Sequence, residues 1–135
     1  MTSMTSYLQK KLLDHSLGIA SYTMPATVYL GLHTSDPGES GSLTGEVSTS
    51  GSAYARISLE TKMNAADGTT GISTNNVTIT FGPATTDWGT ITHVSVSDAA
   101  TAGNMLLKGA LQIAQTLTIG TSVQYTTGQL SITFA

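Results

Sequence analysis

Residues 90–97 read TITHVSVS (Thr90–Ser97), and this stretch decides the fold class of the 135-residue chain. Its side chains form two alternating sets, Ile91, His93, Ser95 and Ser97 against Thr92, Val94 and Val96. Alternation with period two, carried by Thr, Val and Ile, is typical of a β-strand. The stretch therefore predicts sheet structure, and the neighbouring segments decide which kind of sheet.

Further short segments with strand character flank this one on both sides. They cover residues 27–33, 54–60, 77–81, 104–111, 116–119, 122–126 and 129–134. Tight links at Gly120-Thr121 and Thr127-Gly128 separate the last three. Because no βαβ spacing appears, we expect a mainly β fold. The pattern predicts an antiparallel β-sandwich or jelly-roll-like barrel of about 7–8 strands.

One helix is expected, near the N-terminus. Apolar side chains recur there at helical spacing, at Leu8, Leu12, Leu13 and Leu17. Thr5 or Ser6 can cap its start, and Gly18 suits its end. We therefore divide the chain into an N-terminal arm and helix, residues 1–20, and a β-sandwich domain, residues 21–135. The helix either covers one open end of the sandwich or docks onto a partner through its leucines.

The composition excludes several classes of function. Cysteine is absent, and only 10% of the residues are charged, with a net charge of −3. The five Lys and Arg residues are scattered, so we expect no nucleic-acid partner. No apolar run approaches the ~20 residues of a membrane helix, and no signal peptide is evident, so we expect no membrane partner and synthesis in the cytoplasm.

The stretch LGLHTSDPGES, residues 30–40, contains His33, Asp36 and Glu39 at three-residue intervals. These residue types suit a divalent metal or a general base. The spacing is also that of a strand ending in an Asp36-Pro37-Gly38 turn, in which the three side chains need not converge. We expect the turn, with no metal ligand, and consider Asp36 and Glu39 as partner contacts.

The only tryptophan follows an aspartate, at Asp87-Trp88. This pair could bind a glycan, by stacking on the ring and hydrogen bonds to the carboxylate, or Trp88 could close one end of a sheet. His93 is expected to be buried and hydrogen-bonded, and His15 to be exposed on the helix.

Motifs of catalysis are missing. No Gly-x-Ser-x-Gly elbow is present, and the Gly-rich stretches lack the Lys of a phosphate loop. A pair of carboxylates for glycoside hydrolysis would require Asp36 with Glu39 or Glu46 on one loop, which is a poor platform. We expect no catalytic residue and no cofactor, and a metal-dependent hydrolase around His33 is a distant alternative.

Several motifs together resemble a family of small virion structural proteins of tailed bacteriophages, often labelled tail fibre proteins. They are PATVYLGLHTSDPGESG at 25–41, Glu-Val-Ser at 46–48, Tyr-Ala-Arg at 54–56, and TDWGTITHVSVSDAATAGNMLLKGAL at 86–111, together with the leading helix YLQKKLLDHSLG. The sequence departs from the family pattern at Ser95 and Ser97, where Gly and an aromatic residue are usual, and at Leu107-Lys108, where two aromatics are usual.

The resemblance implies a non-enzymatic structural subunit of the virion, made in the host cytoplasm. It is compatible with a capsid-decorating protein or with a component of the tail fibre or tail tip. The expected partners are copies of the chain itself and other capsid or tail proteins. The loop at 34–53 is a candidate contact feature. The alternative function is a carbohydrate-binding module that recognises a host-surface glycan.

Overall fold

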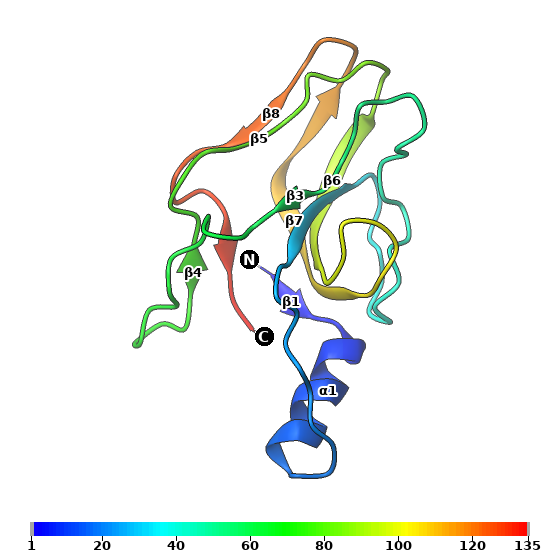
Figure 1. The fold of residues 1–135 in the computed structure, drawn as a ribbon. Coiled ribbons are helices and arrows are strands. Elements are labelled where there is room, and N and C mark those ends of the chain that lie inside the picture. Colours follow the sequence, from blue (N-terminus) through cyan, green and yellow to red (C-terminus); the bar gives the residue numbers. More distant parts are fainter. Residues whose placement is uncertain (1, 135) are drawn as a thin grey trace.

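The computed structural model describes residues 2–134, which form one helix and nine short strands (Figure 1). Their bounds are β1 (Ser3–Met4), α1 (Ser6–Ser16), β2 (Tyr29–His33), β3 (Ile57–Ser58), β4 (Ser73–Thr74), β5 (Ile79–Phe81), β6 (Gly89–Ser97), β7 (Met105–Leu117), β8 (Val123–Tyr125) and β9 (Ser131–Ile132). All strand pairs are antiparallel. The predicted mainly β fold with one N-terminal helix is therefore confirmed.

The largest sheet has five strands in the order β1-β7-β6-β2-β3. On one face, Leu30 lies opposite Val96, and Leu32 lies opposite Val94. All four side chains are buried in the core. On the other face, Gly31 lies opposite Ser95, which is also buried. The sheet therefore has an apolar layer on one side and a layer of small polar groups on the other.

Strand β7 is longer than predicted, because segments 104–111 and 116–119 are joined into one strand. Its pairing with β6 is irregular: Ile91 pairs with Gln115, whereas His93 pairs with Ala110. Residues 111–114 of β7 thus lie opposite Thr92 alone, which makes a β-bulge. The strict alternation predicted for β6 also fails here, since Ile91 and Val94 are both buried in the core.

Two two-stranded sheets, β5-β8 and β4-β9, complete the structure. In β5 and β8 the alternation is as predicted, with Phe81 and Tyr125 buried and the intervening Thr80 and Gln124 exposed. The ring of Phe81 stacks on Tyr54 at 6.2 Å between centroids and meets Tyr125 edge-on at 6.5 Å. These aromatic side chains join the small sheet to the core in a sandwich-like arrangement.

Helix α1 begins at the predicted cap. The Thr5 hydroxyl accepts a hydrogen bond from Leu8 N–H (3.3 Å) and donates one to the Met105 carbonyl (2.8 Å). Gly18, at φ +72°, ends the helical turn in the left-handed conformation that glycine adopts without strain. The helix projects away from the five-stranded sheet (Figure 1). Within residues 2–134 the single helix, α1, has 11 residues and falls short of the length and hydrophobicity that a membrane span requires.

The first residues are integrated into the sheet. Ser3 and Met4 pair with Lys108 and Leu107 of β7. Thr2 exchanges two hydrogen bonds with Thr133, at 2.9 and 3.0 Å. Residues 2 and 133, near the two limits of the described range, thus lie side by side (Figure 1). The division at residue 20 stays a prediction, but residues 3–4 already belong to the main sheet.

Candidate functional site

The turn after β2 is the one predicted from Asp36-Pro37-Gly38. Gly38 has φ +84°, and its N–H donates to Asp36 Oδ1 at 2.9 Å. Asp36 and Glu39 converge on the Lys108 ammonium, at 2.8 and 2.9 Å. Hydrogen bonds to Asp36 and then Glu39 raise the pKa of Lys108. Both carboxylates remain more than half exposed. They are therefore accessible to a partner at this surface.

His33 does not join this pair of carboxylates. Its side chain is fully buried, with Nδ1 2.8 Å from the Thr44 carbonyl and Nε2 2.8 Å from the Ser95 hydroxyl. Because a carbonyl only accepts, Nδ1 carries the proton and Nε2 accepts from Ser95. Within residues 2–134, no three His, Asp or Glu side chains are grouped so as to hold a metal ion.

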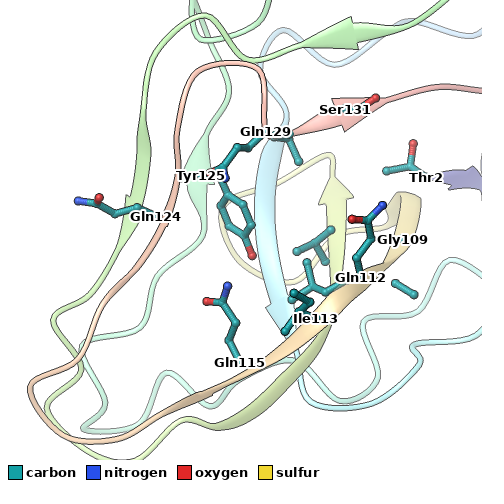
Figure 2. A pocket seen from close by; sticks show the side chains of 13 residues that line it. Thr2, Gly109, Gln112, Ile113, Gln115, Gln124, Tyr125, Gln129 and Ser131 are labelled. Atoms are coloured by element: carbon teal, nitrogen blue, oxygen red, sulfur yellow. The ribbon is translucent and has the colours of Figure 1, made fainter.

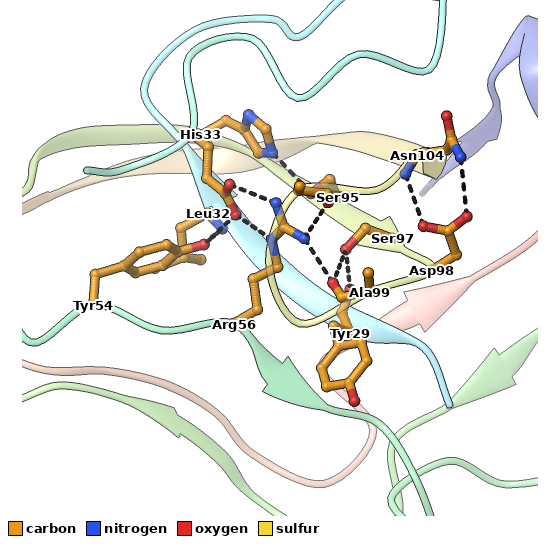
Figure 3. A network of polar contacts seen from close by, with 12 residues as sticks. Tyr29, Leu32, His33, Tyr54, Arg56, Ser95, Ser97, Asp98, Ala99 and Asn104 are labelled. Carbon is orange, nitrogen blue, oxygen red and sulfur yellow. Dashed lines mark hydrogen bonds and ion pairs between the residues drawn. The ribbon is translucent and has the colours of Figure 1, made fainter. Parts of the chain in front are cut away.

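Beside His33 lies a buried ion pair that the sequence did not single out (Figure 3). Arg56 Nε and Nη2 donate to the two carboxylate oxygens of Glu46, at 2.6 and 2.8 Å. Arg56 Nη1 also donates to the carbonyls of Ala99 and Ala102, at 2.6 and 2.8 Å. The guanidinium of Arg56 thus connects the loop at 34–53, which contains Glu46, to the loop between β6 and β7.

Tyr54 extends this network to the backbone of β2. Its hydroxyl donates to Glu46 Oε2 at 2.9 Å and accepts from Leu32 N–H at 2.9 Å. Burial raises the pKa of the Glu46 carboxyl, but hydrogen bonds from Arg56 and Tyr54 outweigh burial and hold that pKa below its ordinary value. The sequence contained one indication of this network. Charged residues are rare in the chain, and an Arg within an alternating segment needs a partner when it is buried.

The network and further backbone hydrogen bonds hold the loop at 34–53 against the sheet. Val47 N–H donates to the Leu32 carbonyl at 3.0 Å, and Met105 N–H donates to the Gly41 carbonyl at 2.7 Å. Gly41 has φ +93°, and a Cβ there would lie 2.8 Å from the Cβ of Tyr7. The loop is therefore a packed layer over the sheet, and its charged contact candidates are confined to Asp36 and Glu39.

We expect the buried histidine to make stability depend on pH. Burial lowers the pKa of His33, and the hydrogen bond to Thr44 raises it only in part. In the unfolded chain this histidine takes up a proton near pH ~6.5, whereas the folded protein resists protonation until a lower pH. The free energy of unfolding should therefore fall as the pH falls below ~6.5. Urea unfolding between about pH 5 and 8 measures this slope.

The matched variants are His33→Gln, which removes the buried titrating group, and His15→Gln at an exposed histidine. His33→Gln should flatten the slope over this range, and it should do so more than His15→Gln does. An unaltered slope in His33→Gln would contradict the assignment.

Trp88 closes the core beside the start of β6. Its side chain is 5% exposed, its indole N–H donates to the Ser52 carbonyl at 2.8 Å, and its ring meets Tyr54 edge-on at 5.5 Å. Asp87 is exposed and accepts from Ile119 N–H at 3.0 Å. A glycan contact by Asp87 and Trp88 stays a prediction, but the ring offers no open face for stacking in this arrangement. His93 is half-buried rather than fully buried, and it pairs with the Thr92 hydroxyl at 2.8 Å.

The four leucines of the helix differ in their surroundings. Leu8 is 1% exposed and belongs to the core, and Leu12 packs partly against that core. Leu13 and Leu17 are 59% and 65% exposed, and Ile19 beyond the helix is 70% exposed. The helix is thus attached through its first turns, while the end that projects from the sheet presents uncovered apolar side chains.

A family model described as "Podophage GP4 fiber I protein gp80" matches residues 3–133 of the chain. A search of curated proteins finds no match. The matched range contains every motif that carried the resemblance in the sequence, from the helix to the segment at 86–111.

Proposed function

The chain belongs to the podophage GP4 fiber I protein gp80 family and is thus a fibre structural protein of a tailed-phage virion, and from this membership we propose that it docks onto a neighbouring virion protein through the free end of α1. Exposed apolar groups that lie close together mark interaction sites on soluble proteins. Leu13 and Leu17 are four residues apart and so share one face of the helix end. Ile19 follows two residues later, and all three side chains are exposed. Their exposure is the observation that carries the proposal.

We place the subunit in a tail fibre or at the tail tip rather than on the capsid surface. The fibre named in the family description favours this position. Self-association is part of the proposal, because the chain has low net charge and exposed apolar side chains at further places, such as Val77. Light scattering of the purified chain measures this association.

We also propose that the subunit is not an enzyme. A serine and a histidine do meet, at Ser95 and His33, but both side chains are at most 1% exposed and a substrate cannot reach them. The exposed carboxylates of Asp36 and Glu39 share one counter-ion, the ammonium group of Lys108. These arrangements support a role in assembly.

The docking proposal predicts that Leu13→Asp with Leu17→Asp removes the protein from particles. A phage that lacks the gene would be complemented with an epitope-tagged copy, and purified particles would be examined by immunoblot and gold labelling. We expect the wild-type copy to label the tail and the double variant to be absent, because two charges replace the apolar contact. Circular dichroism should show both proteins equally folded.

Ile119→Asp is the matched control, since Ile119 is also exposed, at 67%, but lies away from α1. It should enter particles normally. Normal incorporation of the double variant would overturn docking through α1. Gold labels over the capsid would instead favour the capsid-decorating alternative.

A further inference from the structure

A groove with a volume of about 390 Å³ lies between β7 and the C-terminal strands β8 and β9 (Figure 2). Its polar side chains include Gln112 and Gln115 of β7 and Tyr125 of β8. Its apolar side chains include Ile113 and Leu130. None of the residues that line it carries a charge. The groove therefore offers neutral hydrogen-bonding groups next to apolar surface, at the small end of the usual size of ligand sites.

Tyr125 is the unusual member of this set. Its side chain is 8% exposed, and its hydroxyl has no hydrogen-bond partner among the described residues. Figure 2 shows this hydroxyl pointing across the groove toward Gln115 and Ile113. An unpaired buried hydroxyl costs about 1–3 kcal/mol, and native proteins retain few of them. Burial raises its pKa to about 12, so the hydroxyl is protonated and available as a donor.

The bulge in β7 presents the opposite wall. Gln112 and Ile113 lie within residues 111–114, which have no regular partners in β6, and Gln115 follows directly. Bulges turn side chains away from the direction that a regular strand would give them. The amides of Gln112 and Gln115 make no hydrogen bond to another described residue, and both side chains are exposed. They are thus free to bind a ligand and to move aside from Tyr125.

We propose that this groove binds a neutral saccharide of one or two sugar units. Amide side chains both donate and accept, as sugar hydroxyls require, and the Tyr125 hydroxyl gains the partner that it lacks. The C–H faces of a sugar ring fit beside Ile113 and Leu130. The absence of charge along the lining disfavours a phosphate, a nucleotide or an acidic sugar. The site adds ligand recognition to the assembly role proposed above.

An added peptide strand suits the groove less well. Strand addition depends on a row of evenly spaced N–H and C=O groups along a free edge. The bulge at residues 111–114 interrupts this spacing in β7. The free groups of the groove are instead side-chain amides and a phenol, which recognise a ligand with hydroxyls of its own.

The test is a glycan array probed with the biotinylated full chain, assembled on streptavidin for avidity, followed by titration of the best soluble saccharide into ¹⁵N-labelled protein. We expect binding to neutral glycans and shifts of the Gln112 and Gln115 side-chain amide signals. Tyr125→Phe and Gln115→Ala should each weaken binding by about tenfold or more, because each removes one buried hydrogen bond to the ligand.

A stability measurement separates this role from a structural one. Since the hydroxyl of Tyr125 has no partner in the fold, Tyr125→Phe should unfold at the same urea concentration as the wild type or at a higher one. Gln9→Ala, at an exposed glutamine of α1, is the control and should leave binding unchanged.

Four results would overturn the proposal. The first is that no neutral glycan binds and the two groove variants self-associate as the wild type does. The second is that Tyr125→Phe and Gln115→Ala bind as the wild type does. The third is that binding is lost in Asp87→Asn instead. The fourth is that no glycan binds and the two groove variants change self-association. The third result would place the glycan beside Trp88, and the fourth would identify the groove as a contact between copies.

Discussion

Replacing Arg56 with alanine is expected to lower the free energy of unfolding by about 3–5 kcal/mol, the largest effect of any single charge removal in this chain. The side chain of Arg56 is 4% exposed and that of Glu46 is 16% exposed. Removal of the guanidinium leaves the carboxylate of Glu46 buried without its counter-ion. It also leaves the carbonyls of Ala99 and Ala102 without their donor. Urea unfolding followed by circular dichroism measures the loss.

Two variants make the interpretation of Arg56→Ala specific. Lys10→Ala breaks an exposed pair with Asp14, in which Lys10 is 75% exposed, and should cost less than about 1 kcal/mol. Arg56→Met with Glu46→Gln removes both charges and should cost less than Arg56→Ala alone. If Arg56→Ala and Lys10→Ala had equal effects, the pair at Glu46 would be solvated and would not hold the loops together.

Trp88→Ala is expected to cost about 3–5 kcal/mol, because it removes a large buried side chain and leaves a cavity that its neighbours fill only in part. The cavity would open beneath Tyr54, whose ring meets the indole. The carbonyl of Ser52 would also lose the indole N–H. The midpoint of thermal unfolding should fall accordingly, as measured by circular dichroism.

Trp88→Phe keeps most of the volume and loses the indole donor, so its cost should be smaller than that of Trp88→Ala. Ile119→Ala, at a position that is 67% exposed, should leave the midpoint nearly unchanged. A folded Trp88→Ala protein with wild-type stability would show that the ring is dispensable to the core. Glycan binding would then be the remaining role considered for Trp88.

The elements that sequence predicts well are those governed by local rules. The helix follows from the spacing of its leucines and the cap at Thr5, and the turn after β2 follows from Pro37-Gly38. Alternation locates β5 and β8 to within two residues of their observed bounds. These signals depend on residues that are neighbours in the sequence, so they can be recognised before the fold is known.

The features that could not be predicted from the sequence depend on residues that are far apart in the chain. Strands β1 and β4 have two residues each and exist only because β7 and β9 lie beside them. The strand expected at 54–60 shortens to Ile57–Ser58, and Tyr54 and Arg56 reach Glu46 with their side chains.

Local sequence patterns do not predict the candidate sites either. Glu46 and Arg56 are ten residues apart, and no periodicity brings them together. The groove depends on a bulge whose register appears only when β6 and β7 are paired. Asp36 and Glu39 could therefore be recognised in the sequence as accessible carboxylates, whereas the buried network and the glutamines of the groove could not.

The pairing of β1 with β7 also constrains how the chain matures on the ribosome. Ser3 and Met4 leave the ribosome well before their partners, Lys108 and Leu107, which follow about a hundred residues later in the sequence. Thr5 likewise waits for Met105 and Leu106. Until then α1 has no surface against which Leu8 can be buried. Helix α1 thus remains without its packing partner until β7 has been synthesised, and the main sheet closes in a late step that brings residues 3–5 against residues 105–108.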